Sequence, residues 1–117
     1  MSEHTHHAID YIEITALDVA ASRAFYEQAF GWQFTEYAPT YLGIRRPDGT
    51  EAGGLCAAEE VSIGGPLVIL YSEDLEATLK AVEAAGGEIV KPIFEFPGGR
   101  RFHFTDPTGH ELAVWAK

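Results

Sequence analysis

The chain has 117 residues, of which 46% are hydrophobic and 22% charged, and its formal net charge is −10. This composition is typical of a soluble globular protein, and the length suits one domain. The acidic balance argues against a nucleic-acid partner, because binding to phosphates requires clustered lysine and arginine. No apolar run approaches the ~20 residues of a membrane span, and the first residues do not resemble a signal peptide. We therefore expect a cytoplasmic protein that binds no membrane.

The first half of the chain predicts a strand, a helix and three further strands. Residues 8–16 alternate loosely between apolar and polar side chains, as strands do. Asp18 then stands where a helix N-cap belongs, and Gly31 is the expected terminator. Apolar side chains recur between them at helical spacing, at Ala21, Ala24, Phe25 and Ala29. The further strands are predicted at 32–37, 40–46 and 51–58.

The second half repeats this order. A strand is predicted over 66–72, and Ser72 or Asp74 is expected to cap a helix that extends through Ala85. A short strand over 88–91 is then followed by an irregular stretch to Gly99. A closing hairpin is predicted from two strands, at 100–105 and 110–116.

The repeat is supported by three pairs of matching features. Asp18 and Asp74 both open helices, Gly31 and Gly86 both close them, and the turns near Gly49 and Gly109 match. Each half is then a βαβββ unit that is too small to bury a sheet face alone. We predict one α+β domain of two βαβββ modules, at about 8–59 and 66–117, with 1–7 as a flexible tail. Together the modules are expected to form a curved eight-stranded mixed sheet around a cleft, with the helices outside.

Two motifs carry a family resemblance. Asp18, Phe25-Tyr26 and Phe30-Gly31-Trp32 are similar to a signature of the first module of the vicinal oxygen chelate superfamily. The turn Asp106-Pro107-Thr108-Gly109-His110 resembles the terminal element of that family, with histidine in place of asparagine. The superfamily includes glyoxalase I, extradiol dioxygenases and bleomycin-resistance proteins, and this chain looks most like its small bacterial glyoxalase-like members. The resemblance also implies a homodimer.

The resemblance places the metal ligands of that family at four positions of this chain, which are Tyr11, Gly53, Leu67 and Ala113. Divalent ions need several oxygen or nitrogen donors, and none of these residues supplies a carboxylate or an imidazole. We therefore expect no metal at the usual site and no cofactor.

A cleft without a metal is expected to bind a flat or apolar small molecule. The predicted ligand-binding residues combine aromatic, aliphatic and charged side chains: Tyr11, Glu13, Leu67, Ile69, Tyr71, Arg100, Phe102, Ala113 and Trp115. The first functional hypothesis is therefore a small-molecule-binding protein of the bleomycin-resistance type.

Two other functions stay open at this point. Glu13 and Glu111 lie two residues from the expected ligand positions and are candidate catalytic residues. With one histidine they could form a displaced metal site, or Glu13 could act as a general base, in a lyase, isomerase or dioxygenase of glyoxalase type. His103 and His110 are more readily explained as a core or rim histidine and a hairpin cap. The third possibility is a structural role, in which the protein's own side chains fill the cleft.

Overall fold

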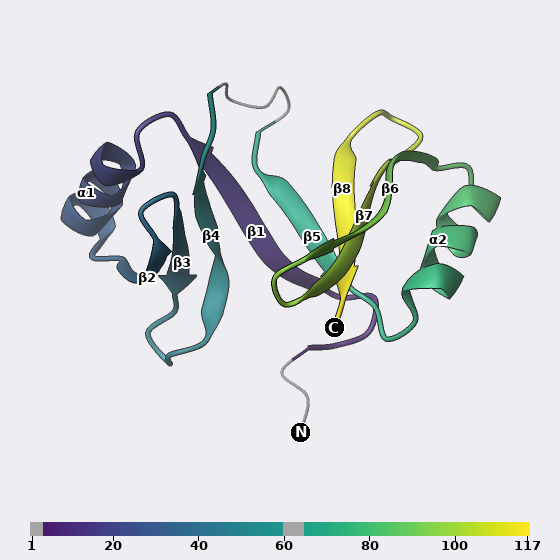
Figure 1. The fold of residues 1–117 in the computed structure, drawn as a ribbon, viewed down its shortest axis with the longest axis horizontal. Coiled ribbons are helices and arrows are strands. Elements are labelled where there is room, and N and C mark those ends of the chain that lie inside the picture. Colours follow the sequence, from purple (N-terminus) through teal and green to yellow (C-terminus); the bar gives the residue numbers. More distant parts are fainter. Residues whose placement is uncertain (1–3, 60–64) are drawn as a thin grey trace. The chain divides into compact units, whose positions relative to one another are not determined.

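The computed structural model describes residues 4–59 and 65–117, which form two compact units. We call the unit Tyr11–Pro66 module 1, and the unit formed by Met1–Asp10 and Leu67–Lys117 module 2. Eight strands are hydrogen-bonded in the order β2-β3-β4-β1-β5-β8-β7-β6 (Figure 1). The predicted α+β fold, with two βαβββ modules and an eight-stranded mixed sheet, is confirmed.

Module 1 contains four strands and one helix: β1 (Ile9–Ala16), α1 (Val19–Phe30), β2 (Gln33–Ala38), β3 (Tyr41–Arg45) and β4 (Glu51–Ala57). The first strand, of which residues 9 and 10 are assigned to module 2, pairs in parallel with the last, β4. The middle strands pair antiparallel with their neighbours, β2 with β3 and β3 with β4. The predicted order of elements is confirmed, with bounds that shift by one or two residues.

Helix α1 begins and ends as the sequence predicts. The Asp18 carboxylate accepts a hydrogen bond from the Ala21 backbone N–H at 3.0 Å, and Gly31 adopts a left-handed conformation with φ of 69°. The apolar face is not the predicted one, because Phe25 is 56% exposed and the helix contains no buried residue. Val19 and Tyr26 pack on the sheet instead.

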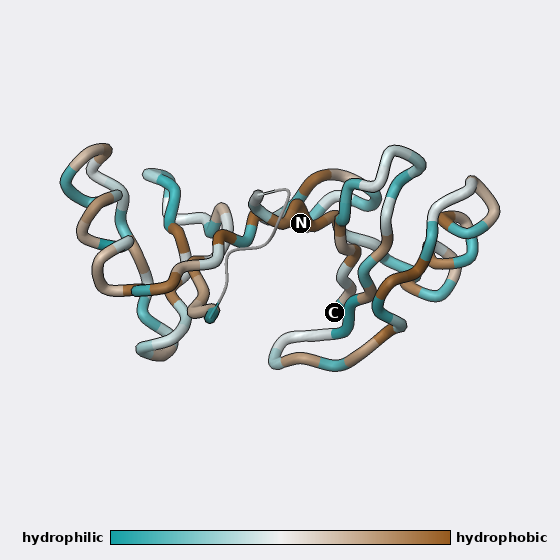
Figure 2. The backbone as a smooth tube through the Cα atoms, turned by 90° about the horizontal axis from the view of Figure 1, so that it is seen from above, coloured by the Kyte–Doolittle hydropathy of each residue, from teal (hydrophilic) through white to brown (hydrophobic). Residues whose placement is uncertain are grey.

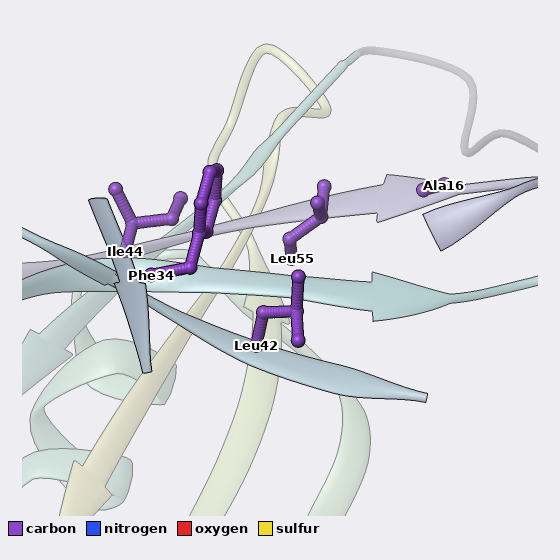
Figure 3. Close-up of a cluster of buried hydrophobic side chains, with 5 residues drawn as sticks. All are labelled: Ala16, Phe34, Leu42, Ile44 and Leu55. Atoms are coloured by element: carbon purple, nitrogen blue, oxygen red, sulfur yellow. The ribbon is translucent and has the colours of Figure 1, made fainter. Parts of the chain in front are cut away.

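The core of module 1 lies between α1 and one face of its sheet. Its buried side chains come from all four strands, namely Ala16, Phe34, Leu42, Ile44 and Leu55 (Figure 3). Trp32 and Tyr26, whose ring centroids stack at 4.6 Å, close the edge of this cluster. Alternate strand residues therefore point to the opposite face, which α1 leaves uncovered.

Module 2 repeats the topology with β5 (Leu67–Tyr71), α2 (Leu75–Ala84), β6 (Glu88–Phe96), β7 (Gly99–Thr105) and β8 (Glu111–Ala116). Again the first strand pairs in parallel with the last, here β5 with β8. The carboxylate of Asp74, rather than the Ser72 hydroxyl, caps α2 by accepting the Ala77 N–H at 3.1 Å. Hydrophilic and hydrophobic residues alternate along both helices (Figure 2), as surface helices require.

The core of module 2 lies between α2 and its sheet. Leu75 of the helix contacts a buried set from β7 and β8, formed by Phe102, Val114 and Ala116. Strand β6 extends to Phe96, so the predicted irregular stretch before Gly99 is wrong. Its pairing with β7 shifts register twice between Ile89 and Phe94, next to Pro92, which cannot donate to a ladder. Because of these shifts, apolar and polar residues do not alternate regularly along β6, and the sequence did not predict the whole strand.

Neither described helix is long and apolar enough to cross a membrane.

Gly53 offers a test of the close packing between β1 and β4. A Cβ atom there would overlap the backbone oxygen of Ile12, which can move only with its strand. We expect Gly53→Ala to lower the free energy of unfolding by about 3 kcal/mol, measured by urea denaturation.

Gly54→Ala is the matched control in the same strand. Its Cβ would overlap the Tyr41 hydroxyl, the end of a side chain that can rotate, so a smaller loss of about 1 kcal/mol is expected. Equal losses for the two variants would show that backbone contact between β1 and β4 does not set the cost.

Candidate functional site

The uncovered sheet face of module 1 carries a cluster of tyrosines and glutamates. Tyr11 and Glu13 reach it from β1, because Ile14 and Ala16 point into the core on the other side. The Tyr11 hydroxyl donates to Oε2 of Glu51 at 2.8 Å, and the Tyr37 hydroxyl donates to Oε1 of the same carboxylate at 2.5 Å. Glu51, which the sequence analysis missed as a site residue, is therefore held by two phenols.

Tyr41 extends this cluster toward Glu13. Its hydroxyl donates to Oε2 of Glu13 at 3.3 Å and lies 2.8 Å from the hydroxyl of Tyr11. Each phenol has a single hydrogen, and Tyr11 directs its own toward Glu51, so at any moment the Tyr41 hydrogen binds either Glu13 or the Tyr11 oxygen. The result is a hydrogen-bonded network that joins Glu13, Tyr41, Tyr11 and Glu51.

The tyrosines of this cluster stay protonated at neutral pH. Burial raises the pKa of Tyr11 far above its usual range, and the hydrogen bonds to Tyr41 and Glu51 raise it further. Burial likewise raises the pKa of Tyr41, and the hydrogen bond to Glu51 raises the pKa of Tyr37. These phenols therefore keep the hydrogens that they donate to Glu51 and Glu13, and they cannot act as bases.

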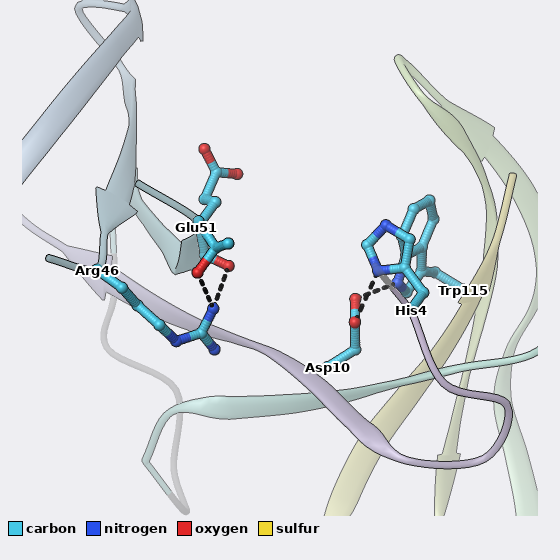
Figure 4. A network of polar contacts seen from close by, with 6 residues as sticks. His4, Asp10, Arg46, Glu51 and Trp115 are labelled. Atoms are coloured by element: carbon cyan, nitrogen blue, oxygen red, sulfur yellow. Dashed lines mark hydrogen bonds and ion pairs between the residues drawn. The ribbon is translucent and has the colours of Figure 1, made fainter. Parts of the chain in front are cut away.

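A β-bulge explains why Glu51 was missed. Ile44 pairs with Gly53 while Arg45 pairs with Glu51, so Ala52 is an extra residue on β4. The bulge turns Glu51 onto the face of Tyr11. Arg46 stabilises the backbone next to the bulge, since its Nη1 donates to the backbone oxygen of Glu51 at 3.0 Å (Figure 4).

The same bulge corrects one expected ligand position. The family resemblance selected Gly53, but the residue of β4 that faces the tyrosine cluster is Gly54, which pairs with Glu13. A Cβ on Gly54 would meet the hydroxyls of Tyr41 and Tyr11, whereas one on Gly53 would meet backbone. The glycine at 54 therefore leaves room for the phenols.

The sheet face of module 2 away from α2 carries an aromatic cluster. The rings of Tyr71 and Trp115 meet edge to face at 5.1 Å, and the indole N–H of Trp115 donates to Asp10 at 2.9 Å (Figure 4). The imidazole of His4 stacks on Tyr71 at 4.9 Å and places its Nδ1 2.7 Å from the other Asp10 oxygen. This role of His4 was not anticipated for the expected N-terminal tail, and residues 1–3 of that tail lie outside the described residues.

The predicted aliphatic site residues add little open surface to this face. Ile69 and Ala113 are register partners on β5 and β8, and both are buried. Leu67, at the start of β5, is half-buried, as is Trp115. The accessible part of the aromatic cluster therefore belongs mainly to Trp115 and to the ring of His4 that covers Tyr71.

Two predicted ligand residues of module 2 lie on the wrong face. Arg100 forms an ion pair with Glu76 of α2 at 2.6 Å, and Phe102 is fully buried in the core under that helix. The sequence prediction put Arg100 and Phe102 on the open face of the sheet, but both point toward α2. Their neighbour Arg101 occupies the aromatic face instead. Its guanidinium lies over the rings of Phe94 and Phe96, at 5.4 and 5.5 Å from their centroids.

His103 and Glu111 form a pair on the same face of module 2. Nδ1 of His103 lies 2.9 Å from Oε2 of Glu111, and the imidazole is buried. Burial lowers the pKa of His103, and the hydrogen bond to Glu111 opposes that shift without cancelling it. The imidazole is therefore neutral at pH 7.

The two candidate catalytic glutamates belong to different modules. Glu13 lies beside Tyr41 in module 1, and Glu111 binds His103 in module 2. Within residues 4–59 and 65–117, no group of three or more histidine, cysteine, aspartate or glutamate side chains is arranged to hold a metal ion.

Comparisons with known proteins agree with this architecture. The chain is 29% identical to the anthracycline biosynthesis protein DnrV of Streptomyces peucetius, over 92% of this chain and 46% of that protein. It is 24% identical to the putative glyoxylase CFP32 of Mycobacterium bovis, over 97% of this chain and 47% of that protein. The chain thus spans about half the length of these curated relatives.

Solved structures share the fold at low sequence identity. The Mn(II)-bound glyoxalase from Novosphingobium aromaticivorans matches with a TM-score of 0.69 and 24% identity, over 95% of this chain and 39% of that one. Methylmalonyl-CoA epimerase from Mycobacterium tuberculosis matches with a TM-score of 0.73 and 14% identity, over 99% and 91%. A family profile described as Glyoxalase/Bleomycin resistance protein/Dioxygenase superfamily matches residues 8–114. The chain therefore belongs to the glyoxalase/bleomycin resistance protein/dioxygenase superfamily.

Proposed function

We propose that this protein binds a planar small molecule on the aromatic face of module 2, without using a metal at the family's usual positions. The observation that carries the proposal is the place on this face that the His4 imidazole occupies, which we call the seat. A flat ring stacks there on Tyr71, meets Trp115 edge to face at 5.0 Å, and binds Asp10 through a nitrogen. A ligand ring that replaced His4 would find the same contacts.

The seat is preorganised, which favours binding. The Asp10 carboxylate fixes the indole of Trp115, and Trp115 in turn contacts the rings of Tyr71 and Phe96. Rings that are already held in place lose little rotamer freedom when a ligand stacks on them. Asp10 also offers an acceptor for an N–H or O–H group at the edge of the ligand.

The relatives support a small organic ligand in general terms. Two of them are named for anthracycline biosynthesis and others as putative glyoxylases. The fold hosts many chemistries, so these names do not choose among ligands. We also propose that the protein acts as a homodimer, which its mass in solution would test.

A second candidate function is catalysis in module 1, of lyase, isomerase or dioxygenase type. The observation in its favour is the hydrogen-bonded network of Tyr41, Tyr11 and Glu51, in which the Tyr41 hydroxyl also donates to Glu13. Protonated phenols of this kind could stabilise an oxyanion, and Glu13 could remove a proton. In its metal-dependent form, this candidate predicts a bound divalent ion.

Binding to the aromatic face can be measured with 2-methoxynaphthalene as a planar probe. We expect the indole N–H resonance of Trp115 to shift during an NMR titration, because that group lies at the seat and binds Asp10. The indole of Trp32, which packs against the core of module 1, is the internal control. Shifts at Trp32 alone would contradict the proposed site.

Replacing the residues of the seat should change the affinity in opposite directions. His4→Ala removes the ring that competes with the ligand and should tighten binding, whereas Trp115→Leu should weaken it about tenfold, the loss expected for one aromatic contact. Asp18→Ala, which removes only the cap of α1, is the control for general destabilisation. Weaker binding to His4→Ala than to the wild type would contradict replacement of the imidazole.

Removal of metal separates the two candidate functions. We expect dialysis against EDTA to leave the thermal unfolding midpoint unchanged, because binding on the aromatic face requires no ion. A near-stoichiometric metal content that is lost in Glu13→Ala or Glu111→Ala would instead favour the enzyme. His6→Ala is the control for ions caught by the histidines of the N-terminal segment, because the His6 ring accepts a hydrogen bond from the backbone N–H of Glu73 and lies away from both glutamates in the sequence.

A further inference from the structure

His103 has an unusual place on β7. It pairs with Ala113 of β8 on the face away from α2, and only 3% of its surface is exposed. Its Nδ1 reaches the carboxylate of Glu111, whose side chain is 47% exposed at the start of β8. A buried imidazole is thus held from one side by a carboxylate at the surface.

This pairing fixes which ring nitrogen carries the hydrogen. A carboxylate can only accept, so the neutral imidazole must carry its hydrogen on Nδ1, facing Glu111. The lone pair is then on Nε2. Burial lowers the pKa of His103, which keeps the ring neutral at pH 7 although Glu111 favours protonation and Arg101 and Lys91 oppose it.

The lone pair on Nε2 is buried and has no hydrogen-bond donor among the described residues. A buried acceptor without a donor is destabilising, and such atoms are few in folded proteins. Nothing in the core packing of module 2 requires a histidine here, because the core contacts of β7 come from Phe102 and Phe104 on the other face. Nε2 is therefore suited to accept a hydrogen bond from a ligand.

Phe94 is an aromatic neighbour of this imidazole. Its ring lies against the imidazole, with centroids 5.8 Å apart and planes tilted by 31°. Phe94 follows the second register shift of β6, where the ladder is interrupted and the strand can yield more easily. A ligand on this face that donates to His103 comes beside the Phe94 ring, and an aromatic ligand can pack against that ring.

We propose that His103 is a specificity residue that selects planar aromatic ligands bearing a hydroxyl group, by accepting a hydrogen bond from that hydroxyl at Nε2. Glu111 is the positioning residue that holds the imidazole in the accepting form. The inference rests on the proposed binding of planar molecules to the aromatic face of module 2. It adds that a phenol-type ligand is preferred over its ether.

The test compares the affinities of 2-naphthol and 2-methoxynaphthalene, measured by calorimetry on the full chain. The two probes share a ring system, but only the naphthol can donate to Nε2. We expect the wild type to bind the naphthol about fivefold to tenfold more tightly, the gain from one net hydrogen bond. In His103→Phe this preference should disappear, while the affinity for the ether is kept.

Glu111→Lys keeps the test decisive if His103→Phe fails to fold, because the side chain at 111 is half exposed. A lysine ammonium can only donate, so Nδ1 must accept from it, the ring hydrogen moves to Nε2, and the preference for naphthol should disappear. Glu95→Lys, on the neighbouring strand β6 and also exposed, is the matched control and should leave the preference intact.

The possible failures are distinguishable. Equal wild-type affinities for the two probes would overturn the role of His103 while leaving the aromatic site in place. A preference for naphthol that survives in His103→Phe or in Glu111→Lys would also overturn it. Failure of both probes to bind would overturn the proposed function and this inference together.

Discussion

In each module the first strand pairs in parallel with the last, and this pairing decides which side chains share a face. It brings Tyr11 and Glu13 beside Gly54 in module 1, and Ile69 beside Ala113 in module 2. One helix covers the opposite face of each sheet and buries the apolar side chains there. The polar and aromatic clusters therefore occupy the only face of each module on which strand alternation can present them together.

Much of the fold followed from local signals that act over a few residues. The caps at Asp18 and Asp74, the left-handed Gly31 and the apolar runs fixed the order of the elements. The register shifts of β4 and β6 were out of reach, because a bulge depends on hydrogen bonds between strands that are distant in sequence. The sequence also placed Phe25 on the buried face of α1, although its side chain is exposed. Apolar side chains recur at helical spacing on both faces of this helix, so spacing alone does not show which face packs on the sheet.

The candidate sites were predictable only in part. Strand alternation placed Tyr11, Tyr71 and Trp115 on the uncovered faces, and the structure brings the last two into contact. Glu51 was missed because the single inserted residue Ala52 reverses its direction. The partnership of His4 with Asp10 and Trp115 joins segments that are 105 residues apart, and no short-range pattern signals it.

The pairing of Gly43 with Gly54 has a consequence for how this protein could diversify. A Cβ on either glycine would overlap the ends of the side chains that make the tyrosine–glutamate cluster. A single mutation at one of these positions thus changes several polar groups at once, without altering any of them chemically. A substitution at either glycine would therefore move several side chains of this surface together. A substitution of one tyrosine would instead remove a single hydroxyl group.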